Sequence, residues 1–377
     1  MNYHIPFNKP YVDHAELSAI GDALQTGKFS GDGKFTQICH RLLEEKTGCT
    51  KALLTHSCTG ALEMAAMLIN VQPGDEVIMP SYTFVSTANA FVLRGAVPVF
   101  VDIREDTLNL NEKLIENAIT SRTRAIVPVH YAGVSCEMDM IMEIAQRHSL
   151  RVVEDAAQGF LATYKKRPLG TIGDAGTFSF HETKNIISGE GGALLINRPE
   201  DVLHGEIIRE KGTDRSRFFR GEIDKYTWQE IGSSYLPAEI VAAFLSVQLK
   251  NAEQINQMRM NIWNMYHARL EELEARGMLR RPVIPAECGH NAHMYYVLLA
   301  DDIDRQDILA RLKERGINPV FHYVPLHTAP AGRRYCRVHG ELCNTEKLSE
   351  RLIRMPLWNS MTEEHVVDVV TTLSELL

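Results

Sequence analysis

Residues 175–197 read AGTFSFHETKNIISGEGGALLIN, and the fold of this chain depends on the turn that they contain. Two apolar runs, residues 175–180 and 191–197, have the length and composition of strands, and a polar, Gly-rich segment separates them. Because parallel neighbours need a crossover of a dozen or more residues, we expect these strands to pair antiparallel, with Lys184 on their connection. A lysine in such a turn is by default a surface residue, so its neighbours in the fold decide whether it is functional.

Upstream of this turn, short apolar runs alternate with helical patterns. The runs are nearly continuous in apolar character, which is typical of parallel strands buried on both faces. The predicted strands are 51–56, 76–80, 98–103, 125–130 and 151–155, and the predicted helices are 61–70, 83–93, 112–119 and 138–147. Together with the antiparallel pair, this pattern predicts an α/β fold with a mixed, mostly parallel, seven-stranded sheet flanked by helices.

The sequence changes character after the seventh predicted strand. A helical pattern runs from Pro237 to about Arg276. Its apolar face carries Ile255, Met258, Ile262 and Met265. Beyond it lie a predicted strand at 294–300, a helix at 305–315, an apolar segment at 318–326 and an amphipathic helix at 365–377. We therefore expect a large domain over residues 1–250 and a smaller C-terminal α/β domain over residues 251–377.

The composition narrows the class of protein. The 377 residues carry a formal net charge of −8, which argues against a general nucleic-acid-binding protein. No apolar run approaches the length of a membrane span, and the first residues lack the apolar core of a secretory signal. The seven cysteines are scattered and form no CxxC motif, so we expect reduced thiols in a cytoplasmic protein rather than disulfides or a metal site.

Ligands of open α/β sheets bind at the carboxyl ends of the strands, where this chain places several polar residues. Ser57, Cys58 and Thr59 follow the first predicted strand and open a helix, whose N-terminal N–H groups would bind an anion such as phosphate. Ser57 or Thr59 could instead simply cap that helix. Phe84, after the second strand, could stack on a planar ring or belong to the core.

A carboxylate completes the set of candidate groups. Asp155 closes the fifth predicted strand and Gln158 follows it, although Asp155 could also be a helix cap. No predicted strand is followed by GxGxxG, so a dinucleotide-binding fold gains no support. With Ser179 and Lys184, these residues match the needs of pyridoxal phosphate. This cofactor requires a lysine that binds it covalently, a carboxylate that keeps its ring nitrogen protonated, phosphate donors and an aromatic face.

The chain resembles the DegT/DnrJ/EryC1 family of sugar aminotransferases, which have the fold-type I aminotransferase architecture. The resemblance extends from GDGKFT (31–36) to MPLWNSMT (355–362). It rests on PSYTFVSTANA, VVEDAAQG, FSFHETKN, GEGGAL and HYVPLH. It implies an enzyme with pyridoxal 5′-phosphate as cofactor, and a homodimer whose active sites are shared between the subunits.

The resemblance also implies a role for each matching residue at the cofactor ring. Lys184 matches the lysine that binds the cofactor covalently, and Asp155 matches the partner of the ring nitrogen. Gln158 matches the residue that faces the ring oxygen, and Phe84 matches the stacking aromatic. Each role is carried over from the family onto the residue at the same place in its motif.

The phosphate contacts follow in the same way. Cys58 and Thr59 match the turn at the phosphate, and Ser179 matches its serine donor. In the family, an Asn of a G-x-N-Y-R stretch often reaches the phosphate from the neighbouring subunit. This chain reads GSSYL at residues 232–236, so Ser234 replaces that Asn. A shorter donor would bind more weakly or through water.

Substrate contacts are expected from two further segments. The loop 209–220, REKGTDRSRFFR, holds five basic residues against two acidic ones, so Arg215 and Arg217 are candidates to clamp a nucleotide diphosphate. The same loop could be an ordinary solvated surface segment. His322 and Tyr323 are candidates to line a sugar pocket, although a histidine on an apolar strand could also be structural.

The implied reaction is transfer of an amino group from L-glutamate to a nucleotide-linked keto sugar. The stretches HETKN, REKGT, KYTW and GSSYL most resemble transaminases that convert dTDP-4-keto-6-deoxy-D-glucose to dTDP-4-amino-4,6-dideoxy-D-galactose for enterobacterial common antigen. Another 3- or 4-keto sugar, or a non-catalytic cofactor-binding regulatory protein, is the alternative. Dehydratases of the same family carry His where this chain has Lys184, which disfavours that activity.

Overall fold

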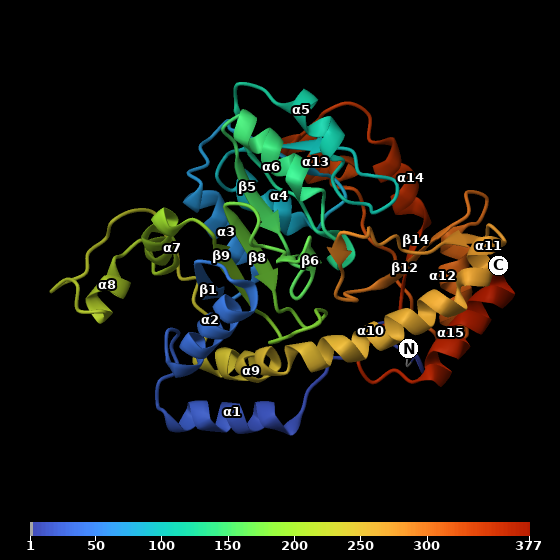
Figure 1. The fold of residues 1–377 in the computed structure, drawn as a ribbon, viewed down its shortest axis with the longest axis horizontal. Helices are drawn as coiled ribbons and strands as arrows, with labels where there is room; N and C mark the ends of the chain where they lie inside the picture. The colour runs from blue at the N-terminus through green and yellow to red at the C-terminus, as the bar shows by residue number, and fades with distance from the viewer. Residues whose placement is uncertain (1–2) are drawn as a thin grey trace.

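The computed structural model describes residues 3–377, and at its centre lies a sheet of eight strands (Figure 1). The strand order is β1-β9-β8-β5-β4-β2-β3-β13. The bounds are β1 Lys51–Thr55, β2 Glu76–Pro80, β3 Val97–Val101, β4 Thr123–Ile126, β5 Arg151–Asp155, β8 Ala175–Ser179, β9 Gly192–Ile196 and β13 Arg337–Val338. All seven predicted strands are present at or near their predicted positions.

The pairing of the strands confirms the predicted mixed sheet. β8 and β9 run antiparallel, with Phe178 opposite Ala193, and β1 runs antiparallel to β9. The pairs β2–β3, β2–β4, β4–β5 and β5–β8 are parallel. The carboxyl ends of β1, β5 and β8 therefore lie at the same edge of the sheet. This topology brings together residues that directly follow three different strands.

The eighth strand is the difference from the predicted seven. β13 is only two residues long and pairs parallel with β3, opposite Val99 and Phe100. The Arg337 guanidinium donates to the carboxylate of Glu76 in β2, which fixes this segment against the sheet. A two-residue strand has no recognisable periodicity, and it covers an edge that would otherwise expose unpaired backbone groups.

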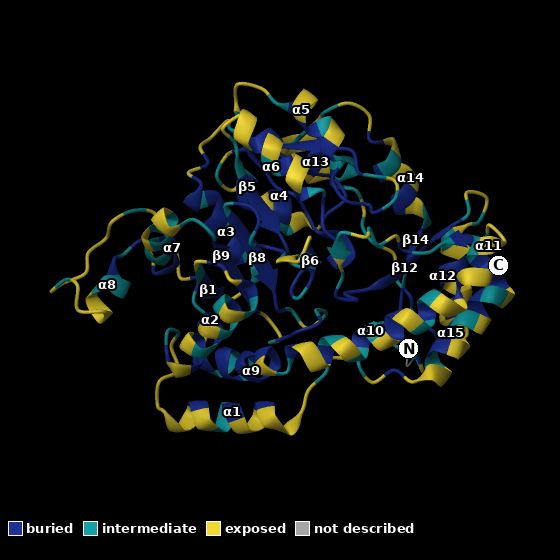
Figure 2. Ribbon diagram, in the orientation of Figure 1, coloured by how far each residue is buried: buried dark blue, intermediate teal, exposed yellow. Residues whose placement is uncertain are grey.

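Helices cover both faces of the sheet. One face packs against α3 (Cys58–Leu68), α4 (Val85–Val92) and α7 (Val202–Arg209), and the other packs against α2 (Lys34–Thr47), α6 (Met138–Arg147) and α9 (Glu239–Lys250). Along β1, Ala52 and Leu54 belong to one core and Leu53 belongs to the other. Figure 2 shows the buried sheet between these helix layers. Burial on both faces is the reason that the strands are apolar at nearly every position.

Two helices precede the first strand, and the sequence patterns had not predicted them. α1 (His14–Gln25) and α2 pack against α9, and the outer face of α1 is exposed (Figure 2). Other short helices are α5 (Ile115–Ala118), α8 (Arg215–Phe219), α11 (Glu271–Ala275) and α13 (Pro330–Tyr335). Among residues 3–377, no helix combines the length and the apolar character needed to cross a membrane.

The C-terminal part has its own sheet and core. Its strands β10 (Leu279–Arg280), β12 (Tyr295–Leu299) and β14 (Leu352–Met355) form one sheet. Its strand β11 (Cys288–Gly289) instead pairs with β6 (Thr163–Tyr164), which with β7 (Arg167–Pro168) belongs to the preceding part of the chain. The helices there are α10 (Ala252–Arg269), α12 (Arg305–Glu314), α14 (Cys343–Arg351) and α15 (Glu363–Leu376). A separate cluster of apolar residues unites α10, α12, α15 and Ile5. The predicted domain boundary at residue 250 stays a prediction.

Two features of this part differ from the predicted elements. The helical pattern from Pro237 to Arg276 is divided among α9, α10 and α11, with non-helical residues at Asn251 and Leu270. The apolar segment 318–326 is irregular except for one bridge between Val320 and Arg354. Its two prolines, in an otherwise strand-like sequence, lack the N–H groups that a strand needs.

Candidate active site

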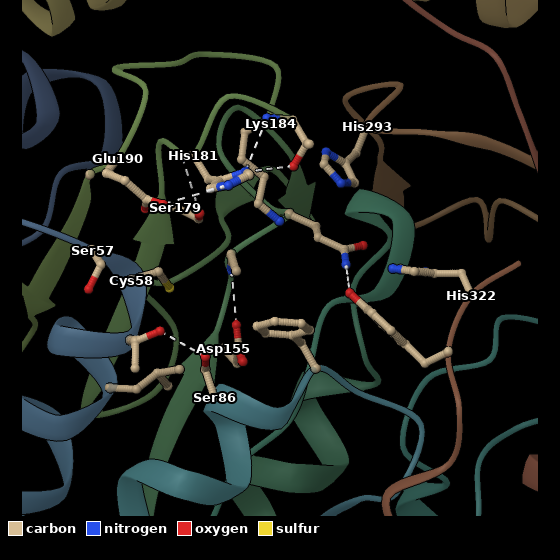
Figure 3. A pocket seen from close by; sticks show the side chains of 18 of the residues that line it. Ser57, Cys58, Ser86, Asp155, Ser179, His181, Lys184, Glu190, His293 and His322 are labelled. Carbon is tan, nitrogen blue, oxygen red and sulfur yellow. Dashed lines mark hydrogen bonds and ion pairs between the residues drawn. The ribbon is translucent and has the colours of Figure 1, made fainter. Parts of the chain in front are cut away.

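A cavity of about 570 Å³ opens at the edge of the sheet where β1, β5 and β8 end. It gathers nine of the residues predicted for the site. These are Cys58, Thr59, Phe84, Asp155, Gln158, Ser179, Lys184, His322 and Tyr323. In Figure 3, Ser57 and Cys58 lie on one side, His293 and His322 lie on the other, and Lys184 and Asp155 lie between them. The tertiary structure thus unites segments separated by more than 200 residues.

The N-terminus of α3 forms one wall of the cavity. The Ser57 side chain accepts a hydrogen bond from the Gly60 N–H at 3.0 Å, so Ser57 is the helix cap. The Thr59 hydroxyl forms a hydrogen bond with the Ser86 hydroxyl at 2.7 Å. The first N–H groups of a helix have no acceptor within it, and with the helix dipole they attract an anion. This wall fits a phosphate group.

Glycine at position 192 permits this arrangement. A Cβ atom there would lie 2.4 Å from the Cys58 nitrogen, which is closer than side chains approach backbone atoms. The first residue of β9 therefore passes directly against the start of α3. The glycines after Lys184 therefore permit both the turn and the close contact between β9 and the start of α3.

Asp155 lies at the carboxyl end of β5 with both carboxylate oxygens hydrogen-bonded. The Thr87 hydroxyl donates to Oδ2 at 2.7 Å, and the Ala157 N–H donates to Oδ1 at 3.1 Å. The side chain is almost fully buried, yet it borders the cavity. It is thus a carboxylate held in a defined orientation, as the partner of a cationic ring nitrogen must be.

Glu154, the residue before Asp155, fixes the end of β5 through contacts on the other face of the sheet. Glu154 points to the opposite face of the sheet and is fully buried. It accepts hydrogen bonds from the backbone N–H groups of Gly170, Ile172 and Gly173, and it pairs with His130 at 2.9 Å. These contacts tie β5 to the segment that leads into β8, the strand before Lys184.

Lys184 lies on the turn between β8 and β9, where its N–H donates to the His181 carbonyl at 2.9 Å. Its partly buried side chain lines the cavity. The pKa of Lys184 is lowered to about 8, chiefly by burial; the Arg354 cation contributes to the decrease, while Cys58 and Asp155 oppose it. About a tenth of this amine is therefore neutral near pH 7, far more than for an ordinary lysine, and the neutral form can act as a nucleophile or base.

Gln158 and two aromatic residues form the wall between the sheet and the C-terminal part. Gln158 Oε1 accepts from the Ala132 N–H at 2.7 Å, and its Nε2 donates to the Tyr323 hydroxyl at 3.1 Å. Phe84 lies beside them, with its ring centroid 6.3 Å from that of Tyr323. Phe84 is 57% exposed, so it is a ring presented to the cavity rather than a core residue.

His322 lines the same cavity as Tyr323 and also has a structural contact. Its Nδ1 is hydrogen-bonded to the Tyr131 hydroxyl at 3.1 Å. Burial lowers the pKa of His322 well below its ordinary value, and the Arg354 cation adds to this effect. His322 is therefore a neutral imidazole at neutral pH.

Three predicted residues lie outside this cavity of the same chain. Ser234 and Arg215 line a second cavity of about 970 Å³, beside α7 and α8. Arg217 forms an ion pair with Glu222 at 3.1 Å. In Figure 1, α8 extends away from the body of the molecule. Their predicted contacts with cofactor or substrate are not seen within this one chain and stay predictions.

Four titratable residues that line the cavity had not been predicted: His181, Glu190, His293 and Arg354. His181 and Glu190 flank the Lys184 turn, and the polar character of that turn was the available signal. Arg354 stands in the apolar run LIRMPL, where a buried charge is unusual enough to mark a functional position. Within residues 3–377, no group of three or more His, Cys, Asp or Glu side chains is arranged to hold a metal ion.

Known proteins resemble this chain over its full length. The sequence profile of the DegT/DnrJ/EryC1/StrS aminotransferase family matches residues 10–374. The spore coat polysaccharide biosynthesis protein SpsC of Bacillus subtilis is 32% identical over 385 residues, which cover 100% of this chain and 98% of SpsC.

Two solved structures are also similar. Helicobacter pylori PseC, an aminotransferase of pseudoaminic acid biosynthesis, is 26% identical with a TM-score of 0.90, over 100% of this chain and 99% of PseC. Spr1654 of Streptococcus pneumoniae, solved in a PLP-form, is 26% identical with a TM-score of 0.90, over 100% of both chains.

Proposed function

The chain belongs to the DegT/DnrJ/EryC1/StrS aminotransferase family, and from this premise we propose that it aminates dTDP-4-keto-6-deoxy-D-glucose at C4. The donor is L-glutamate and the product is dTDP-4-amino-4,6-dideoxy-D-galactose. The more general activity, pyridoxal-phosphate-dependent transamination of a sugar, follows from membership of the family and from similar proteins such as PseC and the PLP-form of Spr1654. The choice of this sugar rests on the resemblance at HETKN, REKGT and KYTW.

The single observation that supports the cofactor chemistry of this proposal is the composition of the cavity. The same cavity is lined by Lys184, whose pKa is lowered, and by the Asp155 carboxylate, which accepts two hydrogen bonds. The N-terminus of α3 and the exposed ring of Phe84 line it as well. These are the groups that pyridoxal phosphate requires. We assign its covalent attachment to Lys184, its ring nitrogen to Asp155 and its phosphate to Cys58, Thr59 and Ser179. Phe84 would stack on the ring and Gln158 would face the ring oxygen.

When bound, pyridoxal phosphate supplies an electron sink that stabilises negative charge at the carbon next to the transferred nitrogen. The protein then has to move protons. Neutral Lys184 takes the proton from Cα of the donor, and in the second half-reaction it delivers a proton to C4 of the sugar on one face. Asp155 holds a proton on the ring nitrogen, and its hydrogen bonds to Thr87 and Ala157 keep it aimed there.

The acceptor and the phosphate would be bound in part by a second subunit. We propose a homodimer in which Ser234 of one chain reaches the phosphate bound to the other. Arg215 and Arg217 would then bind the diphosphate of the nucleotide sugar, which needs cationic partners on a protein of net charge −8. We place the enzyme in the cytoplasm, in the synthesis of enterobacterial common antigen or lipopolysaccharide.

Product analysis tests the proposal directly. Purified protein, L-glutamate and dTDP-4-keto-6-deoxy-D-glucose should give an aminated sugar whose proton coupling constants show an axial amine at C4. An equatorial amine, or amination of a 3-keto sugar alone, would leave the cofactor assignment standing but refute the proposed substrate. Transfer to no sugar nucleotide would favour a non-catalytic, cofactor-binding protein.

A further inference from the structure

His293 is a buried histidine at the border of the Lys184 cavity, and the segments around it fix its position. Its backbone N–H donates to Asn291 Oδ1 at 3.0 Å, and its carbonyl accepts from the Arg259 guanidinium at 2.8 Å. The Asn291 side chain in turn donates to the Gln158 carbonyl at 2.8 Å. These contacts hold the imidazole in the cavity wall, near Lys184 (Figure 3).

The hydrogen bond at Nδ1 of His293 determines which ring nitrogen carries the proton. Its partner is the side-chain amide of Asn185, the residue directly after Lys184, and Nδ1 lies 3.1 Å from Oδ1 of that amide. The Asn185 Nδ2 group donates to the Asn291 carbonyl at 2.7 Å and to Asn256 Oδ1 at 3.2 Å, so the oxygen of the amide faces His293. An amide oxygen can only accept. Nδ1 of His293 therefore carries the proton, and Nε2 has a free lone pair.

This acceptor shares the cavity with a donor that also lacks a partner. Among residues 3–377, neither Nε2 of His293 nor Nζ of Lys184 forms a hydrogen bond, and both atoms are accessible from the cavity. The Lys184 amine is a donor in either protonation state. Burial, with Lys184 and Arg354 as neighbouring cations, lowers the pKa of His293 well below its ordinary value, so the ring is neutral at neutral pH.

We propose that Nε2 of His293 is the hydrogen-bond acceptor that holds the Lys184 amine in place for proton transfer whenever this amine is not bound to the cofactor. This inference rests on the proposed aminotransferase function and makes His293 a positioning residue, because it acts through Lys184. A lysine side chain has four methylene groups, so an unattached amine would otherwise sample many positions. The proton stays on Lys184 throughout, since neutral His293 is the weaker base.

The two other histidines of the cavity are less suited to this role. His322 Nδ1 is hydrogen-bonded to the Tyr131 hydroxyl, which can donate or accept, so this contact does not fix the position of the ring proton. His181 Nδ1 accepts from the Thr183 N–H at 3.2 Å, so the other nitrogen of a neutral His181 carries the proton and is a donor. Of the three histidines, only His293 therefore presents a fixed acceptor to the cavity.

The decisive variant is His293→Asn, because its shorter amide can still donate to Asn185 but offers the cavity no acceptor at the former Nε2. In the half-reaction with L-glutamate, the single-turnover rate constant should fall about 10-fold, as expected for loss of one hydrogen bond to a charged group. The dissociation constant for L-glutamate should not change. His293→Gln should restore most of the rate, since its longer side chain places an amide oxygen near the former Nε2.

The matched control is His290→Asn. His290 lies in the same segment and accepts from the Ala292 N–H at 3.2 Å, but it does not line the cavity. The variant should therefore have the half-reaction rate of wild type. Thermal unfolding and cofactor absorbance establish that each variant is folded and loaded.

The pH dependence of cofactor capture by apo-protein gives a readout without turnover. Its midpoint reports the pKa of Lys184, and an acceptor at Nε2 favours the ammonium form. The midpoint should therefore fall by about one pH unit in His293→Asn, and it should stay near the wild-type value in His293→Gln and His290→Asn. The other groups that interact electrostatically with Lys184 are the same in each variant: Cys58, Asp155, His322 and Arg354.

Nitrogen NMR of apo-protein with isotope-labelled histidine tests the tautomer directly. The His293 signals, assigned by their absence in His293→Asn, should show a protonated Nδ1 and an unprotonated Nε2. The Nε2 signal should shift as Lys184 titrates, and this shift should vanish in Lys184→Ala. Both readouts on apo-protein apply even if no sugar is aminated, whereas failure of the proposed function would appear as the absence of amine transfer in wild type.

Three results would overturn the assignment. An unchanged capture midpoint and rate in His293→Asn would show that His293 has only a structural role. A loss confined to the half-reaction with the nucleotide sugar would show that Nε2 binds the acceptor substrate rather than Lys184. A protonated Nε2 in the NMR spectrum would show that His293 is a donor to the cavity.

Discussion

Lys184 is the residue on which the chemistry depends, and its titration is measurable. Because burial lowers the pKa of this amine to about 8, covalent capture of pyridoxal phosphate by apo-protein should accelerate as the pH rises through about 8. An ordinary lysine would respond only near pH 10.4. Lys184→Ala should abolish the visible absorbance of the bound cofactor. Borohydride reduction and peptide mapping should place the label on Lys184; a label on any other lysine would refute the assignment.

Asp155 should control the rate of amine transfer without controlling the fold. Asp155→Asn keeps a side-chain oxygen that can accept from Thr87 or Ala157, but it no longer stabilises a protonated ring nitrogen. Turnover should drop by about 10²-fold or more, as for other preorganised electrostatic groups. Thermal unfolding and single-turnover rates with L-glutamate measure the two properties. Near wild-type turnover in Asp155→Ala would mean that another residue holds the ring nitrogen.

At the level of elements, the start of α2 depends on a glutamate from α9. The buried Glu239 carboxylate accepts from the N–H groups of Gly33, Phe35 and Thr36, at 2.8 to 3.1 Å. Glu239→Ala would leave these donors buried and unpaired, so the free energy of unfolding should fall by about 3–5 kcal/mol. Glu253→Ala is the control, because Glu253 forms an exposed pair with Lys46 and should cost less than about 1 kcal/mol. Equal losses in urea denaturation would contradict this account.

The helix α8 has a separate predicted role in binding the acceptor. Charge reversal by Arg215→Glu or Arg217→Glu should raise the KM for the nucleotide sugar, because a diphosphate would meet a negative charge. The half-reaction with L-glutamate should be nearly unchanged, since α8 lies away from the Lys184 cavity of its own chain (Figure 1). Arg315→Glu, at an exposed pair with Glu375, controls for net charge. An equal effect on both half-reactions would point to a general loss of structure.

At the level of the whole molecule, the proposed shared sites predict complementation between subunits. Exposed aromatic residues gather near α8, including Phe219 at 66% and Trp228 at 78% exposure, and a second copy of the chain could cover them. Lys184→Ala is expected to be inactive, and Ser234→Asp should also be impaired, because it adds a negative charge beside the phosphate. Mixed dimers of the two variants should regain activity, since one of their two sites combines intact groups. No recovery in dimers that sedimentation shows to be mixed would place Ser234 outside the neighbouring site.

The elements of the sheet and most candidates for the cofactor site could be predicted from the sequence alone. Strands buried on both faces are apolar at nearly every position, and polar residues after their carboxyl ends mark a ligand site. The short link around Lys184 allowed only an antiparallel pair, and β8 and β9 confirm it. These signals are local, because burial and turn geometry depend on residues that are close in the chain.

Contacts between distant segments were decided only by the tertiary structure. Glu239 caps α2 across a separation of more than 200 residues, and β13 closes an edge of the sheet with two residues that show no periodicity. Arg354 and Lys184 line the same cavity although β14 and β8 belong to different sheets, which no local pattern could reveal. Local patterns record which side chains are buried, but not which distant partner each side chain meets. Only packing in three dimensions gives the Arg259 guanidinium its carbonyl acceptors and leaves the Arg354 Nε atom without one among residues 3–377.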